Sequence, residues 1–163
     1  MSVVVVIGNP SPGGRTTAVG QAVGEAVATA RGETDVDTIE LAGIAAHLFE
    51  WGNEAVQATT ARVAAADVVI TACPTYKATY TGLLKAFLDQ YGNDGLAGCR
   101  AVPVMVGASL HHALAPEVHL RPLLVELGAS VPSRGLYVLD SAMDTLETAV
   151  ADWVKIAGPL LSR

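Results

Sequence analysis

The chain alternates between short apolar runs and longer segments in which apolar residues recur with helical spacing. Three of the runs, residues 3–8, 67–73 and 100–107, are apolar almost throughout and are too short to span a membrane. Such runs are typical of parallel strands that are covered on both faces of the sheet. Residues 34–41 and 134–139 predict two further strands. The segment 34–41 alternates apolar residues with acids and is the most polar of the five, which favours a position at the edge of the sheet.

Helix-like segments separate these strands. They cover residues 16–30, 54–66, 83–91 and 141–161, together with a segment that contains Pro122 and ends at Leu127, whereas residues 41–52 are ambiguous. Alternation of this kind predicts an α/β fold in which helices wrap a parallel sheet through right-handed crossovers. With the most polar strand at the edge, the five strands take the order 2-1-3-4-5.

Composition limits the class of protein. The 163 residues predict a single domain, residues 1–163, in which 51% of the residues are apolar and 16% are charged. The net charge of −6 disfavours nucleic acid or anionic lipid as the main partner. No apolar stretch reaches ~18 residues and no leader-like segment is evident, so we expect a cytoplasmic location without membrane contact. Cys73 and Cys99 form no metal-binding pattern and are expected to be small buried side chains.

Three loops have the least generic composition of the chain. They are residues 8–15, 74–82 and 107–113, and they follow the first, third and fourth predicted strands. Open α/β sheets bind ligands beyond the carboxyl ends of the strands at the point where the strand order reverses, here between the first and third strands. The predicted topology therefore brings these loops to one ligand site.

The first loop, NPSPGG, leads from a buried strand into a helix that begins near Arg15. Free backbone N–H groups and the positive end of the helix dipole favour an anion there. Ser11, Thr16 and Thr17 offer hydroxyl donors, and Arg15 offers a fixed cation; the alternative is an ordinary turn with a Ser or Thr cap. Neither the P-loop motif nor the G-x-G-x-x-G fingerprint is present, so a phosphate monoester is the favoured ligand.

The second and third loops supply aromatic, small and basic side chains. In the second, PTYKATYTG, small residues let a flat heterocycle approach, and Tyr76 can pack against a ring. Alternatively, Tyr76 and Tyr80 are half-buried capping aromatics and Lys77 is a solvated charge. The third loop contains His111 and His112. No Cys or carboxylate completes a metal-ligand set with them, so we expect no metal and a histidine that lines the pocket.

Three segments together, GNPSPGGRTT, CPTYKATYTGLLKAFLDQ and VGASLHHALA, resemble the NADPH-dependent FMN reductases of flavodoxin-like fold. The nearest resemblance is to the reductase partners of two-component sulfonate monooxygenases. It covers nearly the whole chain, and the second segment is the most specific part. It implies a flavodoxin-like three-layer sandwich, with FMN and either NADPH or NADH as ligands. The binding residues that it implies are Ser11, Arg15, Thr16 and Thr17 at the phosphate, Pro74, Thr75, Tyr76, Lys77 and Ala78 along the ring and ribityl chain, and Gly107, Ala108, Ser109 and His111 over the ring.

The resemblance also implies a mechanism. Hydride passes from nicotinamide C4 to flavin N5 between stacked rings, which requires orientation but no catalytic acid or base. Reduced FMN then leaves for a flavin-dependent monooxygenase. Two other interpretations stay open. One is an enzyme of the same fold that retains FMN and reduces quinones, azo dyes or metal oxyanions. The other is a non-enzymatic electron carrier of the flavodoxin type.

We also expect the chain to assemble into a homo-oligomer. Many apolar residues with few charges predict exposed patches that subunits hide from water, and hence a homodimer or homotetramer. Members of the sulfonate branch carry an extra residue in the helix after the third loop, often aromatic or His at a subunit interface. Val118 and His119 lie at that place, and Pro122 predicts an irregular helix. Residues 118–127 are therefore the candidate interface.

Overall fold

The computed structural model describes residues 2–162 and has a five-stranded parallel sheet at its centre. The sheet has the order β2-β1-β3-β4-β5, and each neighbouring pair of strands is parallel. This is the flavodoxin-like order, and it confirms the predicted fold class. The strands are β1 (Val3–Ile7), β2 (Val36–Glu40), β3 (Val68–Pro74), β4 (Arg100–Gly107) and β5 (Leu136–Leu139).

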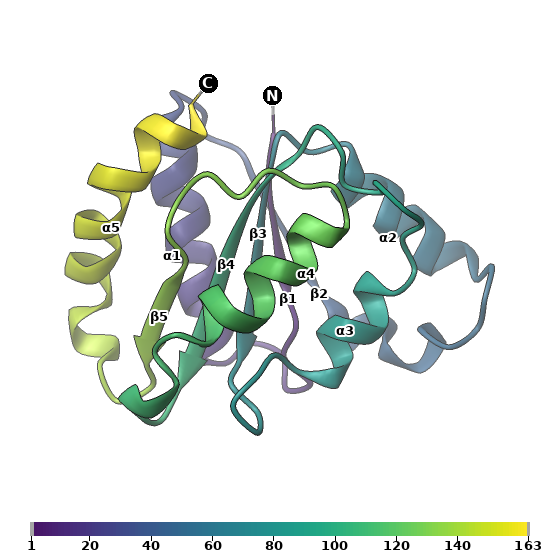
Figure 1. Ribbon diagram of the computed structural model, residues 1–163, viewed down its shortest axis with the longest axis horizontal. Coiled ribbons are helices and arrows are strands. Elements are labelled where there is room, and N and C mark those ends of the chain that lie inside the picture. The colour runs from purple at the N-terminus through teal and green to yellow at the C-terminus, as the bar shows by residue number, and fades with distance from the viewer. Residues whose placement is uncertain (1, 163) are drawn as a thin grey trace.

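Helices cover both faces of the sheet and give the three layers (Figure 1). Helices α1 and α5 lie together on one side, whereas α3 and α4 lie on the opposite side. The α-helices are α1 (Arg15–Ala30), α2 (Glu54–Ala64), α3 (Gly82–Leu88), α4 (Arg121–Glu126) and α5 (Leu146–Leu161). Shorter helical turns are η1 (Leu41–His47), η2 (Leu110–His112), η3 (Pro116–Leu120) and η4 (Met143–Thr145).

The pleat of β1 divides the core into two halves. Val3, Val5 and Ile7 belong to the cluster that contains the buried side chains of α1 and α5. Val4 and Val6 belong to the cluster on the opposite face, with the buried side chains of α2, α3 and α4. Successive side chains of a strand point to opposite faces, so a continuous apolar run is what a doubly covered strand requires.

Two glycines set the distance between α1 and the sheet. A Cβ atom at Gly20 would lie 2.6 Å from Ile7 Cδ1, and one at Gly24 would lie 2.6 Å from Val5 Cγ2. Any larger residue at either position would push the helix outward, because interiors are close-packed. The close approach fixes the start of α1 beside the carboxyl end of β1.

Several element boundaries differ from the expected ones. Residues 41–52, which were ambiguous, contain the 3₁₀ turn η1. The helix that contains Pro122 divides into the π-helical turn η3 and the short α4, so the expected irregularity is present. The terminal helix begins at Leu146, after η4, and not at residue 141. Within residues 2–162, no helix is both long enough and apolar enough to cross a membrane.

Both cysteines are free and buried, as expected. Cys73 lies in β3 and is 0% exposed, and Cys99 is 2% exposed. Burial raises the pKa of the Cys73 thiol to about 12. A thiol in such surroundings is a small apolar side chain and not a nucleophile.

Candidate functional site

A pocket of about 390 Å³ lies beyond the carboxyl ends of β1, β3, β4 and β5, which point toward the lower side of Figure 1. Its volume is in the range of small-molecule sites. The three unusual loops of the sequence and the end of β5 meet there. The residues that line it are Asn9, Arg15, Thr16, Pro74, Thr75, Tyr76, Val106, Gly107, Ala108 and Asp140.

The first loop presents the start of α1 to this pocket. Gly14 is the N-cap residue, and no side chain caps the helix with a hydrogen bond. The first backbone N–H groups of an α-helix have no partner within the helix, so this end favours an anion. Arg15 and Thr16 follow directly, and both line the pocket. The loop therefore has the donors that a phosphate group needs.

Two side chains shape the first loop. Asn9 Oδ1 accepts a hydrogen bond from the Ser11 N–H at 3.1 Å. From the end of β2, Glu40 Oε1 accepts hydrogen bonds from the Gly13 N–H at 3.1 Å and from the Thr17 hydroxyl at 2.7 Å. A carboxylate from the neighbouring strand therefore already occupies one donor of this loop and one of the first turn of α1.

The second loop begins with a tight hairpin. Tyr76 and Thr79 exchange two backbone hydrogen bonds, of 2.9 and 3.1 Å. The central residues Lys77 and Ala78 have positive φ values of 51° and 69°, as a type I′ turn requires. For residues other than glycine this conformation costs about 1–3 kcal/mol each, and such strain is concentrated at ligand sites. The hairpin holds Tyr76, whose exposed fraction is 50%, at the wall of the pocket.

A single hydroxyl connects the first and second loops. Thr81 is 1% exposed and is the N-cap residue of α3. Its Oγ1 donates to the Gly8 carbonyl at 2.6 Å and accepts from the Leu84 N–H at 3.1 Å. The end of β1 and the start of α3 are thus tied together beneath the pocket.

The third loop is held from β5. The Tyr137 hydroxyl donates to the Ser109 carbonyl at 2.7 Å and passes so close to Gly107 that a Cβ atom there would lie 2.1 Å from the hydroxyl oxygen. Only glycine fits at this position. Nearby, Thr75 Oγ1 is buried and has no hydrogen-bond partner among residues 2–162. Because buried hydroxyls normally have a partner, this group is available to a ligand.

The charges in the pocket nearly cancel. Arg15 Nη1 lies 3.8 Å from Asp140 Oδ2, and the side chains are 66% and 37% exposed. Arg15 and Asp140 are also the charged side chains among the lining residues. Within the described part of the chain, no group of three or more His, Cys, Asp or Glu residues has the arrangement of a metal site.

A second, smaller hollow of about 200 Å³ lies beside the π-helical turn. It is lined by residues from the second loop, η2 and η3, namely Ala78, His111, His112, Leu114, Ala115, Val118 and His119. Neither His111 nor His112 lines the larger pocket. The expectation that one of them does so is therefore not met in this structure.

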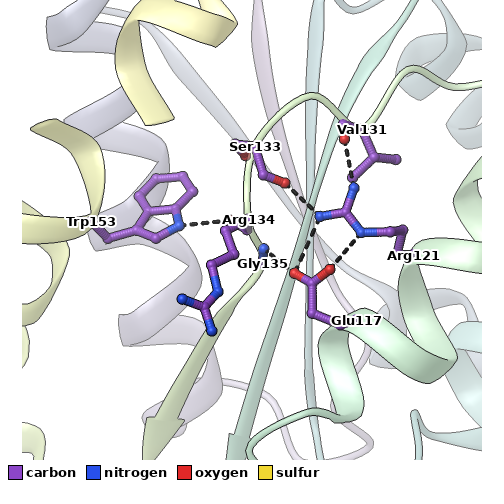
Figure 2. Close-up of polar contacts among 7 residues, drawn as sticks. All are labelled: Glu117, Arg121, Val131, Ser133, Arg134, Gly135 and Trp153. Atoms are coloured by element: carbon purple, nitrogen blue, oxygen red, sulfur yellow. Dashed lines mark hydrogen bonds and ion pairs between the residues drawn. The ribbon is translucent and has the colours of Figure 1, made fainter. Parts of the chain in front are cut away.

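An ion pair fastens the π-helical turn to the segment before β5 (Figure 2). Arg121 donates to the Glu117 carboxylate at 2.6 and 3.2 Å, and to the carbonyls of Val131 and Ser133 at 2.6 Å each. The Gly135 N–H donates to Glu117 Oε1 at 2.6 Å. The Arg121 guanidinium is the main reason that the pKa of Glu117 lies below its usual value.

The structure brings seven of the predicted site residues to the larger pocket, namely Arg15, Thr16, Pro74, Thr75, Tyr76, Gly107 and Ala108. The other six lie elsewhere. The Thr17 hydroxyl is bonded to Glu40, and Ser109 Oγ accepts from the His111 N–H. Ala78 and His111 line the second hollow. Ser11 and Lys77 are exposed.

Three lining residues were missed by the sequence analysis. Asn9 belongs to the first loop, whereas Val106 lies in β4, one residue before the third loop. Asp140 follows β5, and its position at the carboxyl end of a strand was the available signal. The Asp140 N–H donates to the Gly107 carbonyl at 3.0 Å. The end of β5 therefore contributes to the site in addition to the three loops.

The arrangement can hold a phosphate monoester that is joined to a flat ring. The uncapped start of α1, with Arg15 and Thr16, suits the phosphate. Tyr76 and the small residues Gly107 and Ala108 leave room for a ring, and the Thr75 hydroxyl offers it a polar contact. The residues that line the pocket include no pair of carboxylates and no nucleophile–base pair.

Comparison with known proteins agrees with this chemistry. The family described as NADPH-dependent FMN reductase matches residues 1–144. "NADH-dependent FMN reductase SfnF" of Pseudomonas putida is 30% identical over 147 residues, which are 87% of this chain and 79% of that protein. "FMN reductase (NADPH)" of Pseudomonas putida is 38% identical over 79 residues, and this match spans 48% of this chain and only 40% of that relative.

A solved structure has the same architecture over almost the entire chain. The oxidoreductase from Corynebacterium diphtheriae superimposes with a TM-score of 0.85 and 29% sequence identity, over 99% of this chain and 96% of that one. The pocket at the carboxyl ends of the strands is therefore part of an architecture that recurs in a known oxidoreductase.

Proposed function

This chain belongs to the NADPH-dependent FMN reductase family, and from that premise we propose that it transfers hydride from NADPH or NADH to FMN. The observation that carries the proposal is the pocket at the start of α1. It combines an uncapped helix N-terminus, Arg15 and the small lining residues Gly107 and Ala108. FMN, when bound there, supplies the ring that accepts the hydride.

The residues of the pocket divide the work of binding. Arg15, Thr16 and the first N–H groups of α1 hold the phosphate, with Ser11 at the rim of the loop. Pro74, Thr75 and Tyr76, which line the pocket, follow the ribityl chain and the ring, and Lys77 and Ala78 belong to the same hairpin. Gly107 and Ala108 line the opposite side, and we propose that Ser109 and His111, which lie outside the pocket, close over the ring. Hydride transfer depends on the distance between two stacked rings, so these residues act by orientation and by excluding water.

We also propose that FMN is an exchanging substrate and that the reduced flavin passes to a flavin-dependent monooxygenase. The resemblance to the reductase partners of two-component sulfonate monooxygenases supports this step. The exposure of Arg15 and Tyr76 supports it too, because the pocket does not enclose its ligand. An enzyme that retains FMN and reduces a quinone, azo dye or metal oxyanion is the second candidate, since it needs the same pocket.

The experiment uses the purified protein with and without added flavin. We expect a colourless preparation that oxidises NADPH or NADH only when free FMN is present. A yellow preparation that needs a quinone would support the FMN-retaining enzyme. A yellow protein that is inert toward both nicotinamide nucleotides would overturn the proposal in favour of an electron carrier.

We propose that residues 1–163 form one flavin-binding domain and that this domain assembles into a homodimer or homotetramer. Exposed apolar side chains on η3, α4 and the preceding turn support the assembly, namely Leu114, Val118 and Val125. They lie on and beside residues 118–127, the candidate interface.

A further inference from the structure

Two carboxylates flank the place where a phosphate would bind, and the proposed function leaves both without a role. Asp140 comes from the end of β5 and Glu40 from the end of β2, so they lie at opposite edges of the sheet. Both reach the first loop, Asp140 through Arg15 and Glu40 through Gly13 and Thr17.

Asp140 competes with a ligand for Arg15. Its Oδ2 is 3.8 Å from Arg15 Nη1, and both residues line the same pocket. A phosphate that contacts Arg15 must therefore share that cation with a carboxylate. The backbone of Asp140 is anchored, because its N–H donates to the Gly107 carbonyl at 3.0 Å. Its charge consequently stays near the pocket whether or not a ligand is present.

Glu40 acts from the other side of the loop. Its Oε1 accepts from the Gly13 N–H and the Thr17 hydroxyl, two donors of the kind that a phosphate would use. Its Oε2 is buried and has no hydrogen-bond partner among the described residues. A carboxylate in this position is poorly screened by solvent, so it repels a second anion at the start of α1 more strongly than an exposed acid does.

The balance of charges therefore limits how tightly this site binds an anion. One cation and the positive end of α1 attract the phosphate, and two carboxylates oppose them. We propose that Asp140 and Glu40 weaken the binding of the FMN phosphate and thereby keep the flavin exchangeable. This inference rests on the proposed function and assigns to two residues a role in the release of FMN.

Equilibrium binding of oxidised flavin tests the inference without turnover. FMN and riboflavin, which lacks the phosphate, are titrated against the wild type, Asp140→Asn and Glu40→Gln by quenching of flavin fluorescence, at low and high salt. Glutamine at position 40 keeps the oxygen that accepts from Gly13 and Thr17. Glu25→Gln is the matched control, because this exposed acid lies ten residues after Arg15 in α1, about 15 Å along the helix axis.

We expect each of the two variants to bind FMN about three- to fivefold more tightly than the wild type, as the loss of one partly solvated charge predicts. Riboflavin binding should not change in either variant, and FMN binding should not change in Glu25→Gln. The gain in FMN affinity should shrink at high salt, and it should shrink more for Asp140→Asn than for Glu40→Gln. An unchanged FMN affinity, or equal gains for both flavins, would overturn the inference. Weaker FMN binding by Glu40→Gln would also overturn it, because that carboxylate would then serve only to hold the loop.

The outcome separates this inference from the proposed function. If the wild type reduces free FMN while neither variant binds FMN more tightly, the inference fails and the reductase activity stands. If the variants gain affinity for FMN alone while the wild type does not oxidise NADPH or NADH, the charge effect stands and the reductase proposal fails.

Discussion

Arg15 is the residue at which the phosphate assignment can be tested directly. FMN and riboflavin differ only in the phosphate, and a charge-assisted hydrogen bond contributes about 1.5–3 kcal/mol. Arg15 is 66% exposed, so solvent screening should hold its contribution near the lower end of that range. We expect Arg15→Ala to weaken FMN binding about tenfold, which corresponds to about 1.4 kcal/mol. Riboflavin binding should hardly change, and the loss for FMN should shrink as salt rises.

Equal losses for the two flavins would contradict this assignment. A residue that only pins the start of α1 would weaken both flavins alike and would lower the melting temperature. Titration of both flavins against both proteins, together with thermal unfolding, distinguishes the two roles of Arg15.

The hydroxyl oxygen of Thr81 makes two hydrogen bonds that stabilise the fold. Thr81→Val keeps the shape of the side chain but removes the cap of α3 and leaves the Gly8 carbonyl without its donor. We expect the free energy of unfolding to fall by about 2–3 kcal/mol, from the lost cap and the unsatisfied carbonyl together. Thr81→Ser keeps the hydroxyl and should lose about 1 kcal/mol or less. Denaturant unfolding of both variants measures the difference, and equal stabilities would show that the hydroxyl is not needed.

At the scale of elements, the π-helical turn η3 depends on the ion pair that Glu117 forms with Arg121. Hydrogen bonds from Arg121 lower the pKa of Glu117 in the folded protein. A carboxyl group with a lowered pKa contributes stability above its unfolded pKa and loses it as the pH falls through the folded value. We therefore expect Glu117→Gln to reduce the free energy of unfolding by about 1–2 kcal/mol at pH 7.

The difference in free energy of unfolding between Glu117→Gln and the wild type should narrow as the pH falls below about 4.5, which is the ordinary pKa of this carboxyl group. Urea unfolding at several pH values measures this gap. Glu126→Gln, an exposed acid at the end of α4, is the control and should show no such narrowing. A gap that stays constant down to acid pH would mean that the charge of Glu117 does not stabilise the turn.

The sequence predicted the elements whose pattern is local and missed those that depend on distant contacts. β1, β3 and β4 were recognised because strands buried on both faces must be apolar throughout, and β2 was placed at the edge because it is polar. The exact extent of η3 could not be read from the sequence, since Pro122 indicates irregularity but not a π-helical register. Asp140, Glu40 and Tyr137 carry no motif, and only the folded sheet brings them to the first and third loops.

For the whole molecule, exposed apolar surface predicts association. Leu114, Val118 and Val125 are 63%, 55% and 54% exposed and lie on η3, α4 and the turn before them. Light scattering at micromolar concentration should therefore report a homodimer or homotetramer, and Val118→Glu should shift it toward monomer because it places a charge in the apolar patch. A wild-type monomer at that concentration would contradict the prediction.

Because Cys73 is buried, its rate of chemical labelling can report how often the sheet opens. With its pKa raised to about 12, the folded protein offers almost no thiolate at pH 8 to an alkylating reagent. Labelling of Cys73 should then require the central strands to separate, so its rate under native conditions reports the free energy of that opening. Bound FMN, by stabilising the folded state, should slow the labelling in proportion to ligand concentration once the site is saturated. Mass spectrometry of alkylated peptides follows the reaction, and labelling at the rate of a free thiol would contradict the prediction, because Cys73 would then be accessible without any opening of the sheet.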